Sequence, residues 1–261
     1  MGLELLFACA LGLLIGSFLN VVIWRVPRGR SIVSPPSACP SCGHPVRRRD
    51  NVPVLSWLVL RGRCRDCAEP ISVRYPLVEA GTALLFVGVA ARFGTGWELP
   101  AYLYLAAIGL ALALIDIDVH RLPNALVLPS YPVLAGLLTL ASANPGGGAD
   151  WAALGRAALA GAVLFAFYGL LVVVYPRGMG LGDVKLAGVL GLALGWLGWG
   201  SLLVGAFAAF LIGGVFSIVL LATGRANRKT AIPFGPWMVL GAFVGIAVGE
   251  PLWSAYLAIF A

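Results

Sequence analysis

The chain has 261 residues, of which 60% are hydrophobic and only 11% are charged. A soluble domain carries about 25% charged residues, so this composition excludes an ordinary soluble globular protein. The net charge of +7 is compatible with nucleic-acid binding. However, the basic residues cluster in loops beside apolar segments, a pattern typical of membrane topology, and no nucleic-acid partner is expected.

Several apolar runs are long enough to cross a bilayer. They are continuous rather than alternating, which favours helices over strands. The run from Val184 to Thr223 is about twice the length that one span requires, so we divide it at the glycine-rich segment 195–200. The predicted fold class is an all-α polytopic membrane protein with about eight transmembrane helices. The expected spans are residues 3–24, 77–92, 100–116, 123–141, 152–175, 184–199, 201–222 and 235–260.

Positive charge predicts the orientation of these spans. Ten of the eighteen Lys and Arg residues fall between Arg25 and Tyr75, so the positive-inside rule places this loop in the cytoplasm. Counting spans from this loop assigns sixteen basic residues to the cytoplasmic side and only Arg92 and Arg156 to the other side, where both termini are also expected. The basic residues assigned to later cytoplasmic loops are Arg121, Arg177, Lys185, Arg225, Arg228 and Lys229.

The loop also holds four of the five cysteines, as two Cys-x-x-Cys pairs separated by 21 residues. Two such pairs are typical of a tetrahedral zinc site with four sulfur ligands, here Cys39, Cys42, Cys64 and Cys67. Disulfides are the main alternative, but a cytoplasmic loop is reducing. Four cysteine ligands leave no open coordination position, so the predicted zinc is structural, in a zinc-ribbon-like loop. We expect His44 to be a solvated residue rather than a ligand.

Two acidic segments interrupt the apolar sequence. Asp116 and Asp118 follow one membrane-grade run, and Asp183 follows a glycine-rich turn before another. Ionisable groups at such positions are functional candidates, because placing them there is costly. The predicted topology puts Asp116 and Asp183 at the same cytoplasmic edge of the bilayer.

Two neighbouring carboxylates tend to share one proton. The ionised acid can then activate a water molecule while the protonated acid polarises a peptide carbonyl, as in aspartyl proteases. Spacing alone leaves open whether Asp116 or Asp118 is the partner of Asp183. Asp116 is nearer the apolar span, whereas Asp118 is compatible with an ordinary charged turn paired to Arg121 or His120.

In several segments the chain resembles the prepilin peptidases, or type IV leader peptidases, of the Gly-x-Gly-Asp membrane aspartyl protease class. The resemblance implies an endopeptidase that removes the short basic leader of prepilins or pseudopilins after a glycine, at the cytoplasmic face of a bacterial plasma (inner) membrane. It matches Asp116 and Asp183 to the two catalytic aspartates. The segments that carry the resemblance are residues 16–22, 51–53, 56–58, 71–79, 115–124 and 178–185, together with the four-cysteine loop.

The resemblance also implies a second activity. Family members with the large cysteine loop are associated with N-methylation of the new N-terminus by S-adenosylmethionine, but the sequence identifies no residues for it. Glu79, at a membrane boundary beside the loop, is a weak candidate for either role. Many relatives carry an acid where this chain has Asn124, which cannot act as an acid or base. The implied organisation is a first helix (1–24), a cysteine loop associated with methylation (25–76) and a seven-helix peptidase domain (77–261).

Two other functions compete with this interpretation. An ion-coupled membrane transporter with a zinc-binding regulatory loop would also need membrane acids. It predicts acids near the bilayer midplane and an inverted repeat, neither of which the sequence indicates. A catalytically silent assembly factor with a zinc ribbon would leave the Gly-x-Gly-Asp segment without a purpose. Besides its substrates, the expected contacts of the protein are with membrane lipid.

Overall fold

The computed structural model describes residues 2–176, 178–225, 227 and 230–260. Arg177, Arg228 and Lys229, which contribute to the predicted charge bias, lie outside the described residues. The chain forms two compact units, Met1–Thr95 and Gly96–Ala261. The functional segments 1–24, 25–76 and 77–261 are not tested by this division and remain a prediction.

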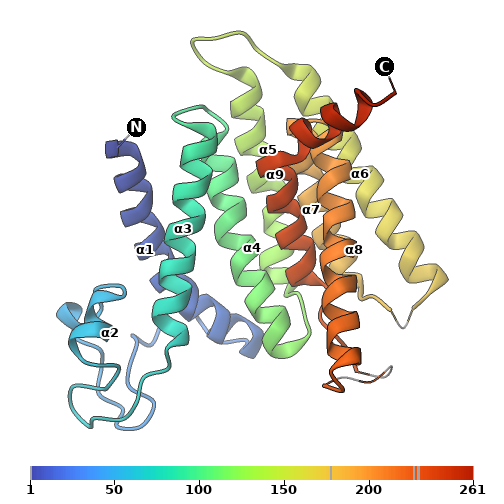
Figure 1. Cartoon of the computed structure of the whole chain (residues 1–261). Coiled ribbons are helices and arrows are strands. Elements are labelled where there is room, and N and C mark those ends of the chain that lie inside the picture. Colours follow the sequence, from blue (N-terminus) through green and yellow to red (C-terminus); the bar gives the residue numbers. More distant parts are fainter. Residues whose placement is uncertain (1, 177, 226, 228–229, 261) are drawn as a thin grey trace. The chain divides into compact units, whose positions relative to one another are not determined.

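The first unit is built on two helices that pack closely, α1 (Gly2–Arg25) and α3 (Arg74–Phe93). Figure 1 shows them side by side. A Cβ atom on Gly16 would lie 2.7 Å from the Cα atom of Glu79, so glycine is needed for this approach of the two backbones. The Asn20 side chain donates a hydrogen bond of 3.2 Å to the carbonyl of Tyr75, which fixes the two helices in register.

The segment between these helices contains three short helical turns, η1 (Val26–Arg28), η2 (Arg48–Asp50) and α2 (Leu55–Val59). Its extended residues form only isolated bridges, and no longer strand occurs among the described residues. The indole N–H of Trp57 donates to the carbonyl of Ile71 at 3.0 Å. This bond ties α2 to the segment that leads into α3.

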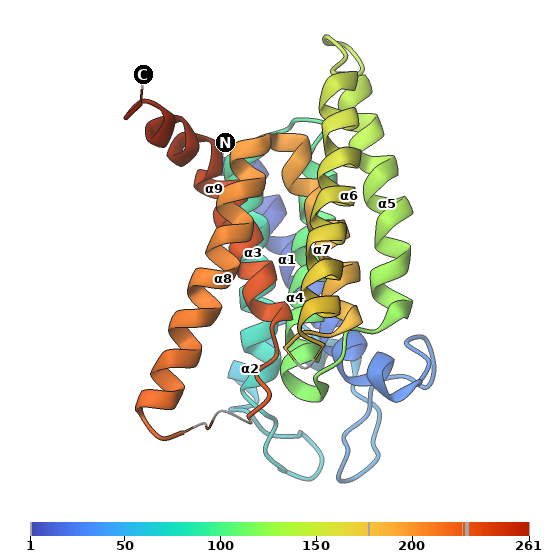
Figure 2. The same ribbon diagram turned by 90° about the vertical axis from the view of Figure 1, so that its right-hand side faces the viewer.

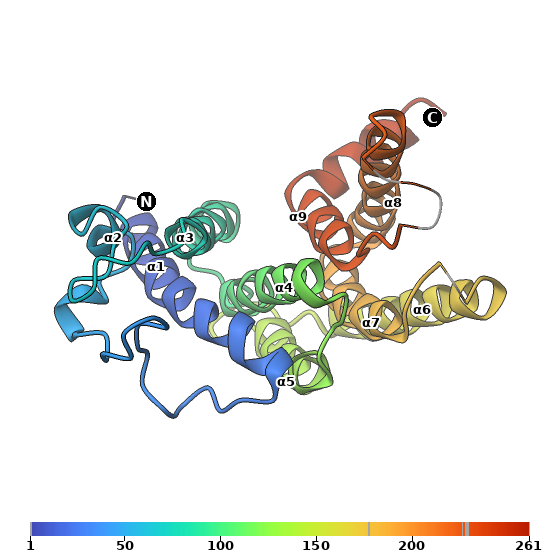
Figure 3. The ribbon, with the colours of Figure 1, turned by 90° about the horizontal axis from the view of Figure 1, so that it is seen from below.

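Among its described residues, the second unit contains six helices, and α7 contacts each of the other five. Of the 17 residues of α7, 11 are buried, because α5, α6, α8 and α9 all contact it. Figures 2 and 3 show α6 beside α7 and α8 beside α9. The helices are α4 (Leu99–Val119), α5 (Asn124–Ala143), α6 (Trp151–Val174), α7 (Leu181–Leu197), α8 (Trp199–Ala222) and α9 (Gly235–Leu257).

The described residues confirm the predicted all-α membrane fold. Seven of their helices are long and apolar enough to cross a membrane, and each corresponds to a predicted span. The remaining predicted span corresponds to α7, whose 17 residues extend about 25 Å, less than the ~30 Å of a bilayer core. The proposed division at 195–200 is confirmed, since α7 ends at Leu197 and α8 begins at Trp199.

We expect Gly191→Ala to destabilise the protein by about 1–3 kcal/mol, the usual cost of overpacking. The new Cβ atom would lie 2.7 Å from the carbonyl oxygen of Ala160 and 2.8 Å from the Cα atom of Gly161, and helix backbone cannot move aside cheaply. The thermal unfolding midpoint in detergent measures the effect. Gly155→Ala is the matched control, because a Cβ atom there has nothing within 4 Å. Equal midpoints for the two variants would contradict the packing described.

Candidate functional site

Asp116 lies near the end of α4, and its side chain is buried at 5% exposure. The backbone N–H of Gly235, the first residue of α9, donates to Asp116 Oδ2 at 3.0 Å. Three residues after Asp116 the helix ends, and His120 takes a left-handed conformation with φ of 51°. The turn there accounts for the short path from α4 to α5.

Asp183 lies in the first turn of α7 and is likewise buried, at 8% exposure. Its Oδ2 accepts a hydrogen bond of 3.0 Å from the backbone N–H of Gly180, the residue before the helix. A carboxylate at a helix N-terminus is stabilised by the helix dipole and satisfies a backbone N–H that would otherwise lack a partner. The glycine-rich turn therefore positions Asp183 through local structure.

The structure brings Asp116 and Asp183 together. The two carboxyl groups lie close enough to interact electrostatically. Leu122, in the turn between α4 and α5, contacts the segments on both sides. A Cβ atom on Gly182 would lie 3.1 Å from Leu122 Cβ, and one on Gly235 would lie 3.4 Å from Leu122 Cδ2. Three segments that are distant in the sequence thus meet at one buried pair of acids.

The neighbouring polar residues of the first acidic segment are placed differently. Asp118 and His120 are both exposed, although His120 lies close enough to Asp116 to interact electrostatically. At the start of α5, the side-chain oxygen of Asn124 accepts a hydrogen bond of 3.0 Å from Lys185 Nζ. Asp116 is therefore buried like Asp183, whereas Asp118 is exposed.

Sequence reasoning missed two groups beside the acids. The first is Gly235, whose N–H donates to Asp116. The sequence signal for this residue is the segment Pro233-Phe234-Gly235-Pro236, which directly follows a basic loop. The second is Tyr168 of α6, which is 1% exposed and close enough to Asp183 to interact electrostatically. Its ring packs 6.3 Å from that of Phe234, measured between centroids. A tyrosine within an apolar run carries no comparable sequence signal.

The four loop cysteines form a compact cluster. Their Sγ atoms all lie within 4.8 Å of one another, with Cys39 and Cys67 at 3.7 Å and Cys42 and Cys64 at 4.0 Å. Tetrahedral coordination with Zn–S bonds of about 2.3 Å requires sulfur atoms about 3.8 Å apart. All four are free thiols rather than disulfides. The cluster can therefore hold a metal ion, as the spacing predicts, and His44 is not a member of it.

The two cysteine pairs are held by equivalent turns. In the first, the N–H of Gly43 donates to the carbonyl of Cys39 at 2.9 Å, and in the second the N–H of Ala68 donates to that of Cys64 at 3.0 Å. Residues Gly43 and Ala68 both have positive φ, at 72° and 59°. Each turn thus presents its two sulfur atoms in the same way.

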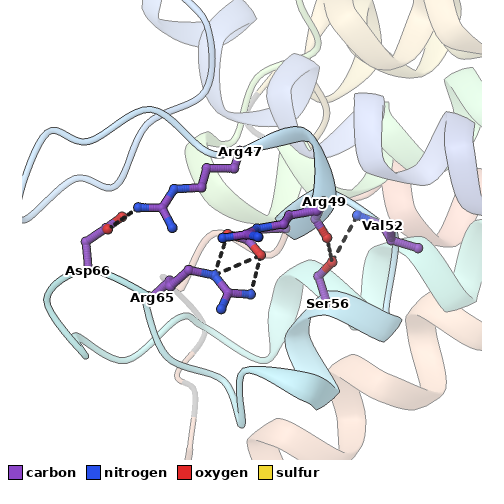
Figure 4. Close-up of polar contacts among 7 residues, drawn as sticks. Arg47, Arg49, Val52, Ser56, Arg65 and Asp66 are labelled. Carbon is purple, nitrogen blue, oxygen red and sulfur yellow. Dashed lines mark hydrogen bonds and ion pairs between the residues drawn. The ribbon is translucent and has the colours of Figure 1, made fainter.

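Ion pairs connect the two turns, as Figure 4 shows. Arg47 follows the first cysteine pair and bonds to Asp66 within the second at 2.6 Å. Conversely, Arg65 of the second pair bonds to Asp50, also at 2.6 Å, and these hydrogen bonds lower the pKa of the Asp50 carboxyl. Such exposed pairs contribute little stability each, so a bound metal would be the main cross-link of the loop.

Glu79 is placed in α3, where its side chain is 8% exposed. Its Oε2 accepts a hydrogen bond of 2.6 Å from the backbone N–H of Val54, the residue before α2. Val54 has φ of 60°, an unusual conformation for a β-branched residue. Glu79 therefore connects the loop to a membrane helix of the same unit.

The fold and the site define a class of protein: an all-helical, polytopic membrane protein with two neighbouring buried carboxyl groups. Residues 10–93 match the family model described as the bacterial peptidase A24 N-terminal domain, and residues 103–218 match that of the type IV leader peptidase family. The chain belongs to the type IV leader peptidase family.

Individual relatives agree with these matches. A protein from Aeromonas hydrophila named prepilin leader peptidase/N-methyltransferase is 37% identical, covering 95% of this chain and 92% of its own. Proteins of the same name from Stutzerimonas stutzeri and Myxococcus xanthus are 37% and 44% identical, covering 97% and 86% of this chain and 93% and 65% of their own. No solved structure matches the chain. The comparisons do not support the transporter alternative.

We expect the purified protein to contain one metal ion per chain and Cys64→Ser to lose it, because three sulfur atoms and a hydroxyl bind such an ion much more weakly. Elemental analysis by mass spectrometry measures the metal content. Cys9→Ser is the matched control, since Cys9 lies in α1, outside the cluster. Metal-free wild-type protein, prepared without chelators, would contradict the assignment.

Proposed function

We propose that this chain is an aspartyl endopeptidase of the bacterial inner membrane that removes the leader of type IV prepilins or pseudopilins and N-methylates the new N-terminus. The observation that carries the proposal is the buried pair Asp116 and Asp183 in a chain of the type IV leader peptidase family. The names of the relatives supply the substrate and the second activity.

In the proposed reaction, the two carboxyl groups share one proton. The ionised group accepts a proton from water, whose oxygen bonds to the carbonyl carbon of the residue before the cleaved bond. The protonated group donates a hydrogen bond to the carbonyl oxygen, which carries the developing negative charge. The C–N bond then breaks. As it leaves, the amine of the mature N-terminus takes the proton that the first carboxyl group accepted from water.

The backbone contacts would orient the two acids for this reaction. The N–H groups of Gly235 and Gly180 each engage the Oδ2 atom of one carboxyl group, at 3.0 Å in both cases. We assign the Oδ1 atoms to the catalytic water and the substrate carbonyl. Fixed carboxylates lose less conformational freedom in the transition state than mobile ones would, which is how such contacts increase a rate.

We further propose that the metal of the cysteine cluster is zinc and that its role is structural. Cys39, Cys42, Cys64 and Cys67 would hold it, because four thiolates in tetrahedral geometry suit this ion and leave no position for substrate. S-adenosylmethionine would supply the methyl group of the second reaction, with the newly exposed amine as acceptor. Glu79 would support the loop by fixing Val54.

The proposed orientation places both acids at the cytoplasmic face. Asp116 lies at the end of α4 and Asp183 at the start of α7, so the two helices run in opposite directions from the site. Arg121 and Lys185 flank the acids in sequence, and the positive-inside rule assigns such residues to the cytoplasm. The same rule assigns the basic loop that contains the cysteines to the cytoplasm.

We expect Asp116→Asn and Asp183→Asn each to reduce cleavage of a co-expressed prepilin by at least ~100-fold, because each removes one of the two proton-transferring groups. The exposed Asp118 provides the control, since Asp118→Asn should cleave normally. Gel shift and mass spectrometry of the mature N-terminus measure the result. Both inactive variants should still methylate a substrate that lacks its leader, which establishes that they are folded. Normal cleavage by either would overturn the assigned pair.

We also expect Gly235→Ala to reduce cleavage, because its Cβ atom would lie 2.8 Å from Asp116 Oδ2 and displace that carboxyl group. A displacement of about 1 Å at a catalytic group costs up to ~100-fold in rate. The cleavage rate of detergent-solubilised enzyme at saturating substrate is the measurement. Gly214→Ala, in α8, is the control because a Cβ atom there has nothing within 4 Å. Equal rates for both variants would show that this contact does not position Asp116.

A further inference from the structure

The short helix α2 exposes its apolar side chains. Leu55, Leu58 and Val59 are 56%, 58% and 68% exposed, and their spacing of three and four residues puts them on one face. On a loop surrounded by water, such a face would be unfavourable. This exposed surface of Leu55, Leu58 and Val59 is called the α2 face below.

The other side of α2 is fixed to the loop. The Ser56 hydroxyl donates to the carbonyl of Arg49 at 3.2 Å and accepts from the N–H of Val52 at 3.0 Å, as Figure 4 shows. Trp57 packs against Gly62 and donates to the carbonyl of Ile71. Because these contacts hold the helix in place, the α2 face is not free to turn inward.

The contacts of the first unit also give the depth of α2 along the membrane helices. Tyr75, at the start of α3, is 47% exposed, as expected of a tyrosine at the membrane interface. Glu79, which binds the N–H of Val54, lies four residues further into α3, or about 6 Å deeper. Val54 directly precedes α2. Because a helical side chain leans toward the N-terminus of its helix, Glu79 Oε2 reaches back toward the level of Tyr75, so α2 begins near the level of that tyrosine.

The charge around α2 suits an anionic surface. Residues 25–75 contain ten basic and three acidic residues. Four exposed arginines lie close to α2 in sequence, two before it and two after it, and two more pack on the ring of the interfacial Trp24. Basic clusters at this level attract anionic lipid headgroups. The arginines concerned are Arg48, Arg49, Arg61 and Arg63 near α2, and Arg28 and Arg30 on Trp24.

We propose that the α2 face inserts into the boundary between headgroups and acyl chains of the adjoining lipid leaflet, while the arginines bind anionic headgroups. α2 is then an interfacial anchor that holds the cysteine loop against the membrane. The anchor would act together with the hydrogen bond that the N–H of Val54 donates to Glu79 in holding the loop against the membrane. This inference concerns lipid contact and does not depend on the proposed peptidase activity.

The first test labels the wild-type protein in lipid vesicles with a hydrophobic photoactivated carbene reagent that partitions into the bilayer. Trypsin then releases residues 50–61, which contain α2, residues 31–47 from the same loop, and residues 75–92 of α3. We expect severalfold more label on 50–61 than on 31–47, and a similar level to 75–92. Label on 50–61 that does not exceed that on 31–47 would overturn the proposal.

The second test measures trypsin cleavage after Arg61 in nanodiscs. For the wild type, we expect severalfold slower cleavage with anionic lipid than with zwitterionic lipid alone. A triple variant, Leu55→Ser, Leu58→Ser and Val59→Ser, should be cut severalfold faster than the wild type on the anionic discs. Val33→Ser is the control and should be cut at the wild-type rate. Val33 is 85% exposed in the same loop but far from α2 in sequence.

Retained metal content shows that the cysteine loop of the triple variant is folded, so that faster cleavage reports loss of the anchor. A folded triple variant that is cut as slowly as the wild type would exclude insertion of the α2 face. Equal wild-type rates on both kinds of disc would exclude the anionic headgroups as its partner.

Discussion

The constraint on which the second unit depends is the cost of burying two carboxyl groups among apolar helices. The free-energy cost of burying an isolated charge there is prohibitive, so each carboxyl group needs a fixed hydrogen-bond partner. The chain supplies backbone N–H groups at the starts of two helices, from Gly235 as the first residue of α9 and from Gly180 directly before α7. Both acids therefore depend on how helices begin, and at Gly235 the missing side chain leaves room for the Asp116 carboxyl group, which a Cβ atom would approach to 2.8 Å.

The cysteine loop solves a different problem, because it contains few apolar residues with which to form a core. Two equivalent turns present four sulfur atoms at the separations that a tetrahedral ion requires, and two exposed ion pairs join the turns. The ion pairs stabilise the loop only weakly because they are exposed, so their main contribution is to align one cysteine turn with the other. A metal ion would supply most of the stability of such a segment.

Glu79 is a third buried acid, and its contact is with the loop. Like the paired aspartates it is almost fully buried and accepts a backbone N–H, but its partner, Val54, belongs to the loop. The contact holds Val54 in a conformation with positive φ, at φ 60° and ψ −50°, that a β-branched residue rarely adopts. A buried carboxyl group in this chain can therefore have a loop residue as its hydrogen-bond partner, as well as a helix start.

The sequence by itself determined the helices and the cysteine cluster. Membrane helices depend on the length and polarity of a continuous segment, and a four-cysteine site depends on local spacing. Only the tertiary structure decided that Asp116 is buried while Asp118 is exposed, that α7 is enclosed by its neighbours, and that Tyr168 and Gly235 lie beside the acids. Gly235 and Asp116 are 119 residues apart, and burial depends on such distant neighbours, which hydropathy and spacing do not encode.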